Sequence, residues 1–320
     1  MRVGMPWEWA QGRLTVENHS IRCACEILLQ FEAPLDAPPV QRERQGRTLV
    51  SVVETELEDG VAFVFLNRPE KKNAMNPALH FAMDETLDRL ETDPAVRAVV
   101  ISGRGGAFSA GQDLKEFFRD LEGDPAGQKK AQAAANSWRW HKLELFPKPT
   151  IAMVDGVCIG GAFTQMIACD FAVAAEDAMF ALSEINWGQI PGGLVARVLT
   201  ECLGYRDALD LALTGRKIDG IEAARLRLVN EAVPKGDLRT RVTELARTLA
   251  GKDPEAYRAT KHAVRQVRAM PMRQAEDYLA AKIGELRMRA GASAQQTAIR
   301  RFVDDKSYRP AEGSYTEVKD

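Results

Sequence analysis

The chain has 320 residues, of which 45% are hydrophobic and 28% charged, as in an ordinary globular protein and unlike a disordered one. Its formal net charge of −2 excludes the basic field of a nucleic-acid-binding protein, and no apolar run approaches the ~20 residues that cross a bilayer. Five scattered cysteines, an odd count without a secretory signal, predict reduced thiols in a cytoplasm. The four histidines have no metal-ligand spacing, so no metal site is predicted.

The first 47 residues differ from the rest of the chain. They contain a proline-rich run at 33–39 and a polar run at 41–45, and they lack sustained periodicity. We therefore expect residues 1–47 to be a disordered or loosely packed leader. A catalytic core over 48–250 and a C-terminal helical subdomain over 251–320 are expected to follow.

Two strands and a capped helix open the core. Residues 49–57 and 61–67 predict strands that are joined by the Asp-Gly turn at 59–60. Asn76 followed by Pro77 predicts the start of a helix, with asparagine as the cap and proline in the first position. The apolar stripe of this helix is Leu79, Met83, Leu87 and Leu90.

Strands and helices then alternate, which predicts βαβ units and a mainly parallel α/β core. The expected strands are 96–102, 151–155 and 171–174. Beyond Gly192 the chain is almost all helix, with one short strand expected at 228–232. The candidate helices there are 194–203, 206–213, 237–250, 254–268 and 272–289.

The glycine pair Gly160-Gly161 lies between a predicted strand and a predicted helix. A helix N-terminus exposes unpaired N–H groups, and glycine lets a ligand oxygen approach the backbone closely. The alternative is a tight turn without a ligand. No Lys-Ser or Lys-Thr pair follows, so the turn is not a phosphate loop.

The segment Gly105–Asp113 follows a predicted strand and is rich in small residues. Strand ends in open α/β sheets are where ligands bind, so this segment is a candidate for a second N–H donor. The alternative is a surface loop, and Asp113 is more typical of a helix cap than of a catalytic acid.

Glu184 lies within apolar sequence, between Leu182 and Trp187. Burial raises the pKa of a glutamate, which suits a general acid/base, whereas the alternative is a solvated loop residue.

Thr164 follows Gly160 by one helical turn, and its alternative role is a hydroxyl that bonds back to the main chain. Two N–H donors and one glutamate form a constellation that stabilises a thioester enolate.

These pieces, in this order, resemble the crotonase (enoyl-CoA hydratase/isomerase) superfamily over about residues 48–310. The matching segments are Asn67–Met75, Ser109–Leu114, Pro149–Val154, Gly160-Gly161, Cys169-Asp170, Ser183-Glu184 and Thr214-Gly215. The resemblance implies an α/β fold with a spiral core of ββα units and a C-terminal helical subdomain. It also implies a trimer or a dimer of trimers.

Within the superfamily, the chain is most similar to the hydroxycinnamoyl-CoA (feruloyl-CoA) hydratase-lyases of phenylpropanoid degradation, which form vanillin-type aldehydes. The segments that indicate this are Asp113–Phe118, Trp138–Trp140, Leu182–Gly188, Glu276–Leu279 and Asp304–Ser307. The resemblance implies hydration of the thioester and then retro-aldol cleavage to an aromatic aldehyde and acetyl-CoA. Coenzyme A is part of the substrate, and no further cofactor is implied.

The resemblance also implies a role for each site residue. The N–H groups of Gln112 and Gly161 form the oxyanion hole, and Glu184 is the acid/base. The coenzyme A cleft is lined by Lys71, Ala74, Ala110, Gly111, Gln112, Asp113, Leu114 and Lys115. The aromatic end of the substrate meets Thr164, Tyr278 and Phe117.

The chain departs from the family pattern at this aromatic end. Ordinary enoyl-CoA hydratases have a second catalytic glutamate where this chain has Thr164, and the lyases have a serine there. Phe117 replaces a tyrosine that helps bind the phenol, and Gln112 replaces a methionine. Tyr278 has the alternative role of packing on the core face of its helix. Two other functions stay open: a hydratase or isomerase without cleavage, and a catalytically silent acyl-CoA-binding protein.

Overall fold

The computed structural model describes residues 51–290 and 293–307. The leader expected at 1–47 lies outside these residues, as do Cys23 and Cys25. The described residues belong to one compact unit. The division into a core and a helical subdomain at residues 250–251 stays a prediction.

The main sheet has six strands in the order β1-β2-β3-β5-β7-β10. Its strands are β1 (Val53–Glu58), β2 (Val61–Leu66), β3 (Ala98–Gly103), β5 (Thr150–Val154), β7 (Phe171–Ala175) and β10 (Glu231–Val233). Only β1 and β2 pair antiparallel, through the predicted Asp-Gly turn, and the other pairs are parallel. The expected parallel core is therefore confirmed. All six residues of β2 are buried, as expected for a strand covered on both faces.

The strand expected at 228–232 begins later, at Glu231. Leu228 N still donates to Ala223 O at the end of α7 (Gly220–Arg225), so the chain is turning there. Pairing with β7 starts only after Asn230, whose Oδ1 accepts a hydrogen bond of 2.8 Å from Ala172 N.

A second sheet of four strands has the order β4-β6-β8-β9. Its strands are β4 (Ala107–Ser109), β6 (Val157–Ile159), β8 (Met179–Ala181) and β9 (Lys217–Asp219). Each has three residues, which is too short for an alternating pattern, and the sequence did not predict them. Three times, a main-sheet strand is followed by a small-sheet strand and then by helical chain, which is the expected ββα repeat.

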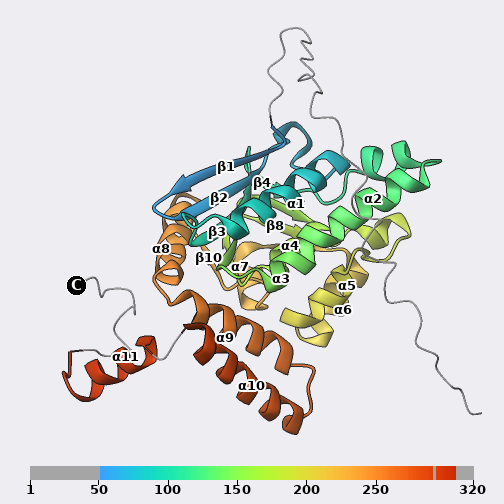
Figure 1. The fold of residues 1–320 in the computed structure, drawn as a ribbon. Helices are drawn as coiled ribbons and strands as arrows, with labels where there is room; N and C mark the ends of the chain where they lie inside the picture. The colour runs from blue at the N-terminus through green and yellow to red at the C-terminus, as the bar shows by residue number, and fades with distance from the viewer. Residues whose placement is uncertain (1–50, 291–292, 308–320) are drawn as a thin grey trace, which may run out of the picture. The chain divides into compact units, whose positions relative to one another are not determined.

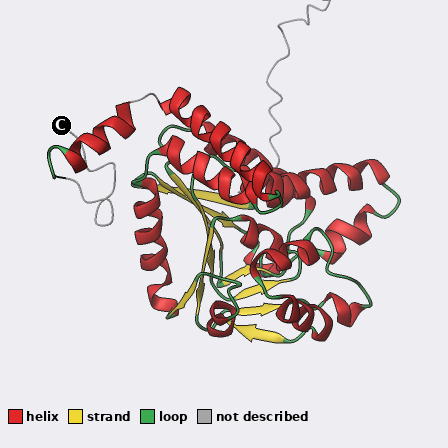
Figure 2. Cartoon of the chain, turned by 90° about the horizontal axis from the view of Figure 1, so that it is seen from below, coloured by secondary structure: helices red, strands yellow, loops and turns green. Residues whose placement is uncertain are grey.

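Helix α1 (Pro77–Thr92) begins where the sequence predicts. Asn76 Oδ1 accepts a hydrogen bond of 2.9 Å from Leu79 N, and the whole predicted apolar stripe is buried. The α8 helix (Leu238–Ala250) packs across the strands of the main sheet (Figure 2). The α9 (Pro254–Val267) and α10 (Met272–Ala290) helices lie side by side (Figure 1).

The remaining α-helices are α2 (Pro125–Asn136), α3 (Leu143–Leu145), α4 (Ala162–Ala168), α5 (Val195–Cys202), α6 (Tyr205–Thr214) and α11 (Ser293–Val303). Two π-helical segments, η2 (Leu114–Phe118) and η4 (Ser137–Lys142), flank α2. No helix in the described ranges combines the length and the apolar character that a bilayer crossing requires.

Asp170 joins the C-terminal helices to the core. It precedes β7, and its Oδ2 accepts hydrogen bonds of 3.0 Å from Thr150 N and Tyr257 Oη. Its Oδ1 lies 2.9 Å from Lys261 Nζ and 3.1 Å from Arg265 Nη2, and both cations come from α9. The carboxylate therefore fixes α9 against the ends of β5 and β7.

We expect Asp170→Asn to destabilise the fold by about 3 kcal/mol, because it leaves the buried Lys261 ammonium without its counter-ion. Urea unfolding followed by circular dichroism measures this change. The matched control is Asp177→Asn at an exposed carboxylate just beyond β7, for which we expect a change below about 0.5 kcal/mol. Equal changes in unfolding free energy for the two substitutions would contradict a stabilising role for the buried ion pairs of Asp170.

Candidate functional site

The Gly160-Gly161 turn joins β6 to α4, as predicted. Gly160 has a φ of +56°, in the left-handed region that favours glycine, and its N–H donates to Ala181 O at 3.0 Å. Gly161 is the N-cap of α4, and its N–H has no hydrogen-bond acceptor among the described residues. The turn therefore presents one free donor at the start of a buried helix.

A second free donor comes from Gln112. Met75 N donates to Gly111 O at 2.8 Å and Asp113 N donates to Met75 O at 3.0 Å, so the Gln112 N–H points away from this bridge. That N–H also lacks an acceptor within the described part of the chain. A Cβ atom on Gly111 would lie 2.8 Å from Ile159 O and 3.4 Å from Gly161 N. Glycine at 111 thus lets the two donor segments lie in contact.

Glu184 lies on the other side of the turn, at the start of the 3-10 helix η5 (Glu184–Trp187). A Cβ atom on Gly160 would lie 2.8 Å from Glu184 Oε1. Glu184 Oε2 is buried and has no hydrogen-bond partner in the described residues. Burial raises the pKa of this carboxyl above its ordinary value. The glutamate is therefore not a fully solvated loop residue.

The three residues expected at the aromatic end each make different contacts. Thr164 is buried, and its hydroxyl donates to Gly193 O at 2.9 Å, so it bonds to main chain of another segment rather than to its own helix. Phe117 is also buried, with its ring edge-to-face against His80. Tyr278 is half-buried on α10, where its ring lies 5.9 Å from Lys282 Nζ. These contacts leave the substrate-binding roles of all three residues as proposals.

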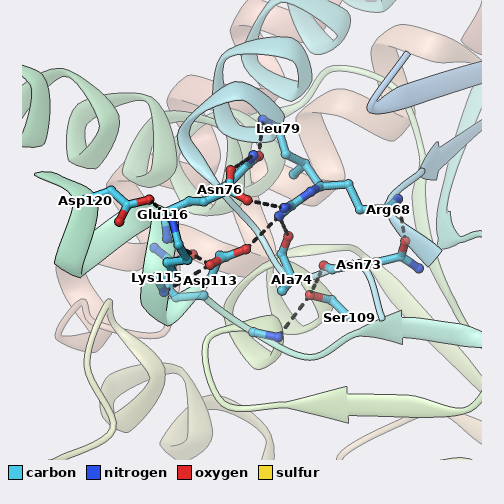
Figure 3. Close-up of polar contacts among 12 residues, drawn as sticks. Arg68, Asn73, Ala74, Asn76, Leu79, Ser109, Asp113, Lys115, Glu116 and Asp120 are labelled. Atoms are coloured by element: carbon cyan, nitrogen blue, oxygen red, sulfur yellow. Dashed lines mark hydrogen bonds and ion pairs between the residues drawn. The ribbon is translucent and has the colours of Figure 1, made fainter. Parts of the chain in front are cut away.

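Ion pairs fix the segment that carries Gln112 (Figure 3). The buried Arg68 guanidinium lies 3.0 Å from Asp113 Oδ2 and 2.7 Å from Glu116 Oε1, and it donates to Ala74 O at 2.5 Å. Glu116 in turn accepts a hydrogen bond of 2.6 Å from Asn76 Nδ2. These contacts join the start of α1 and the segment before it to the chain just beyond Gln112.

Asp113 is the cap of η2, in line with the structural alternative for this residue. It accepts hydrogen bonds from Lys115 N at 3.0 Å and Glu116 N at 2.9 Å. Burial alone would raise its pKa, but the hydrogen bonds from Glu116 N and Arg68 outweigh burial and hold the pKa below its ordinary value. Its oxygens are thus occupied by protein donors.

The other residues expected at the coenzyme A cleft lie along the same two segments. Ala110 N donates to Lys72 O at 2.8 Å, which joins the segments. Lys71, Leu114 and Lys115 are exposed. Two of the cleft candidates, Lys71 and Lys115, are therefore exposed cations, and Lys115 forms an ion pair with Asp120.

The sequence did not predict a buried chain of hydrogen bonds behind Gln112. Trp138 Nε1 donates to His80 Nδ1 at 2.9 Å, so the proton of His80 lies on Nε2, which is 2.9 Å from Gln112 Oε1. Burial lowers the pKa of His80 to about 3, so the ring is neutral at physiological pH. Trp138 belongs to one of the family-like motifs, and nothing local in the sequence pairs it with a histidine 58 positions earlier.

The structure also has a groove of about 970 Å³ near α9. It is lined by Asp170, Tyr257, Lys261 and other residues of α4, α5, β7 and α9, and it does not include Glu184 or the Gly160-Gly161 turn. We place the candidate site at the turn, because two free N–H groups and an unpaired carboxylate oxygen meet there.

Comparisons with known proteins identify the family of the chain. A model of the enoyl-CoA hydratase/isomerase family matches residues 56–307. A hydroxycinnamoyl-CoA hydratase-lyase from Pseudomonas fluorescens is 45% identical, over 82% of this chain and 96% of that protein. The enoyl-CoA hydratase EchA19 from Mycobacterium tuberculosis is 32% identical, over 74% of this chain and 84% of that protein.

Solved structures show the same fold. The crystal structure of an enoyl-CoA hydratase from Polaromonas sp. JS666 has a TM-score of 0.73 and 26% identity, and the match covers 80% of this chain and 98% of that chain. AtuE from Pseudomonas aeruginosa has a TM-score of 0.71 and 30% identity, over 79% and 97% of the two chains. The chain therefore belongs to the enoyl-CoA hydratase/isomerase family.

Proposed function

We propose that this enzyme is a lyase that hydrates a hydroxycinnamoyl-CoA thioester and cleaves the product to an aromatic aldehyde and acetyl-CoA. With feruloyl-CoA the aldehyde would be vanillin. The observation that carries the proposal is a single unpaired carboxylate, Glu184, beside two free N–H groups, with Thr164 rather than a second acid on α4. The similarity to the hydratase-lyase of Pseudomonas fluorescens supports it.

The two N–H groups serve as the oxyanion hole. In this role Gln112 and Gly161 donate to the thioester oxygen, which gains negative charge when the thioester becomes an enolate. Because both donors are fixed in place before the reaction, they need no reorganisation as the charge develops. The two donors stabilise the thioester oxygen more strongly in the transition state than in the ground state, and this difference is what raises kcat.

Glu184 then carries every proton transfer. Its carboxylate takes a proton from water, whose oxygen bonds to Cβ, and it returns that proton to Cα of the enolate. In the second stage it takes the proton of the β-hydroxyl, the Cα–Cβ bond breaks, and the electron pair forms the enolate of acetyl-CoA. Protonation at Cα by Glu184 then releases acetyl-CoA. The same oxyanion hole serves both enolates.

At the aromatic end, we propose that Thr164 and Tyr278 contact the ring. The Thr164 hydroxyl donates its proton to Gly193 O, so it presents only lone pairs to a substrate. Phe117 would form an apolar part of the ring-binding site and has no hydroxyl to offer the substrate. The coenzyme A moiety would lie along Ala74 and 110–115, with Lys71 and Lys115 available to its phosphates.

The buried Phe117 favours one second candidate, a hydratase that acts on an acyl-CoA without a phenol and does not cleave the product. Its ring packs on His80 and offers no hydrogen bond to a ring hydroxyl. This alternative keeps the same oxyanion hole and the same acid/base. It differs only in whether carbon–carbon cleavage follows hydration.

We also propose that the protein works in a cytoplasm as a trimer or a dimer of trimers. Several large apolar side chains are exposed on η5 and α6, two elements that are in contact: Ile185, Trp187, Tyr205, Leu209 and Leu213. Such a patch is typical of a surface that another chain covers. The described cysteines Cys158, Cys169 and Cys202 are free thiols, which fits a reducing compartment.

Incubation with feruloyl-CoA tests the proposed function directly. We expect vanillin, followed by its absorbance, and acetyl-CoA, quantified by chromatography, in equal amounts. Glu184→Gln keeps the shape of the side chain but cannot accept a proton, so it should lower turnover by about 10²–10⁴-fold without abolishing thioester binding. Hydration without aldehyde release would support the second candidate, and no turnover of any enoyl-CoA would support a silent binding protein.

The pH profile should report the raised pKa of Glu184. The base form is lost as pH falls through the folded-state pKa, so the acid limb of kcat/KM should lie above 4.5, the ordinary value for glutamate. The same shift predicts that Glu184→Gln raises Tm near neutral pH, because a charged carboxylate no longer has to be buried. This gain should vanish below the unfolded-state pKa, where Glu184 is protonated in both states. A gain that persists at low pH would contradict a titrating carboxyl.

A matched pair of substitutions tests the donor at Gly161. Both Gly161→Ala and Gly161→Pro add a Cβ atom, which would lie 3.2 Å from Arg139 Nη1, but only proline removes the N–H. The φ of −55° at this position fits the proline ring. We expect kcat to be lower in the proline variant than in the alanine variant by about 10²–10³-fold. If the two variants have equal Tm and equal kcat, the Gly161 N–H is not part of the oxyanion hole.

A further inference from the structure

Arg139 is a buried cation without a counter-ion. It lies in η4 and is only 2% exposed, and its Nε donates to Ala135 O at 2.9 Å. No carboxylate among the described residues pairs with Arg139. The other buried arginine in the described chain, Arg68, pairs with two carboxylates. Burial lowers the pKa of Arg139 to about 10, so the group remains charged at physiological pH.

The two terminal nitrogens of Arg139 face the candidate site. A Cβ atom on Gly161 would lie 3.2 Å from Nη1, and one on Gly193 would lie 3.2 Å from Nη2. The guanidinium thus lies between the glycine of the oxyanion hole and the glycine whose carbonyl accepts the Thr164 hydroxyl. Neither nitrogen has a hydrogen-bond acceptor within the described residues.

Arg139 and Glu184 lie against neighbouring glycines of the same turn. Glu184 Oε1 faces Gly160, whereas Arg139 Nη1 faces Gly161. The two charges form no ion pair in the described structure, and each has atoms without a protein partner. An unpaired buried charge destabilises a fold by several kcal/mol, so the position of Arg139 favours an anion that the described part of the chain does not supply.

The proposed reaction produces such an anion at this position. In each stage negative charge leaves Glu184, on the Gly160 side, and appears on the thioester oxygen, on the Gly161 side. A fixed cation nearer the second position lowers the energy of the enolate more than that of the starting carboxylate. We infer that Arg139 stabilises the enolate electrostatically, as a third group beside the N–H donors of Gln112 and Gly161.

This inference rests on the proposed function only in placing the thioester oxygen at Gly161. The enolate oxygen is favoured over an oxygen on the aromatic ring, because Nη1 lies against the oxyanion glycine itself. The oxygen at ring position 4 of a hydroxycinnamoyl group lies at the opposite end of the conjugated acyl chain from the thioester oxygen. A ring oxygen as the partner is therefore a distinct outcome of the test.

The test uses enolate formation without cleavage. The full chain is incubated in D₂O with 3-phenylpropanoyl-CoA, and exchange of its α-protons is followed by NMR for the wild type and for Arg139→Lys, Arg139→Gln and Arg139→Met. We expect the two neutral variants to exchange at least about tenfold more slowly, and Arg139→Lys to retain more of the rate. Affinity for the thioester should change little, because the ground-state oxygen is uncharged.

Thermal unfolding separates this role from a structural one. Removal of an unpaired buried charge should leave Tm unchanged or raise it, whereas removal of a structural arginine should lower it. If Arg139→Met folds poorly, the comparison of Arg139→Lys with Arg139→Gln decides, and equal exchange rates in that pair overturn the inference. Unchanged exchange in both neutral variants overturns it as well.

Turnover of two substrates completes the test. Equal losses of kcat with cinnamoyl-CoA and 4-hydroxycinnamoyl-CoA support enolate stabilisation, and a loss confined to the 4-hydroxy substrate overturns it in favour of a ring oxygen. The outcomes for the proposed function are separate. A wild type that exchanges α-protons but does not cleave feruloyl-CoA would contradict the lyase and leave the role of Arg139 intact.

Discussion

Two backbone N–H groups without protein acceptors are the constraint on which this structure depends. Both residues are partly buried, and a donor that is kept from water without a partner is unfavourable, so the surrounding chain has to hold both donors in place. Gly160 does so with a left-handed φ of +56°, and the bridge between Met75 and Gln112 does so from another segment. Gly111 completes the arrangement, because any side chain there would collide with Ile159 O.

Two separate networks hold the Gln112 segment. One consists of ion pairs and the other of hydrogen bonds between neutral groups. In one network the buried Arg68 binds Asp113 and Glu116 through ion pairs, which fix the backbone beyond the donor. On the core side neutral His80 passes one hydrogen bond from Trp138 to the Gln112 amide. The neutral ring is essential to that chain, since a protonated imidazole would have no lone pair to accept from Trp138.

The sequence predicted the parts of the site that depend on local chemistry. The Gly160-Gly161 turn, the Asn76 cap and the unusual position of Glu184 each follow from residues within one turn of the chain. The three-residue strands of the second sheet were missed, because an alternating pattern needs more residues to show. His80, Trp138 and Arg139 were missed for another reason: their roles arise from contacts between segments far apart in sequence, and each has an ordinary local role as a core residue.

The arrangement of charge explains how one site can serve both addition and cleavage. In the proposed mechanism each stage begins with a negative charge on Glu184, which is partly desolvated and has a raised pKa, and each forms an enolate beside Gly161. Burial makes the starting carboxylate less stable, while the N–H donors and Arg139 make the enolate more stable, so both effects reduce the same energy difference. A second carboxylate in place of Thr164 would raise the energy of a neighbouring enolate. Thr164 adds no charge at this position, and its hydroxyl proton is donated to Gly193 O, so the charge that moves between Glu184 and the enolate meets no second acid on α4.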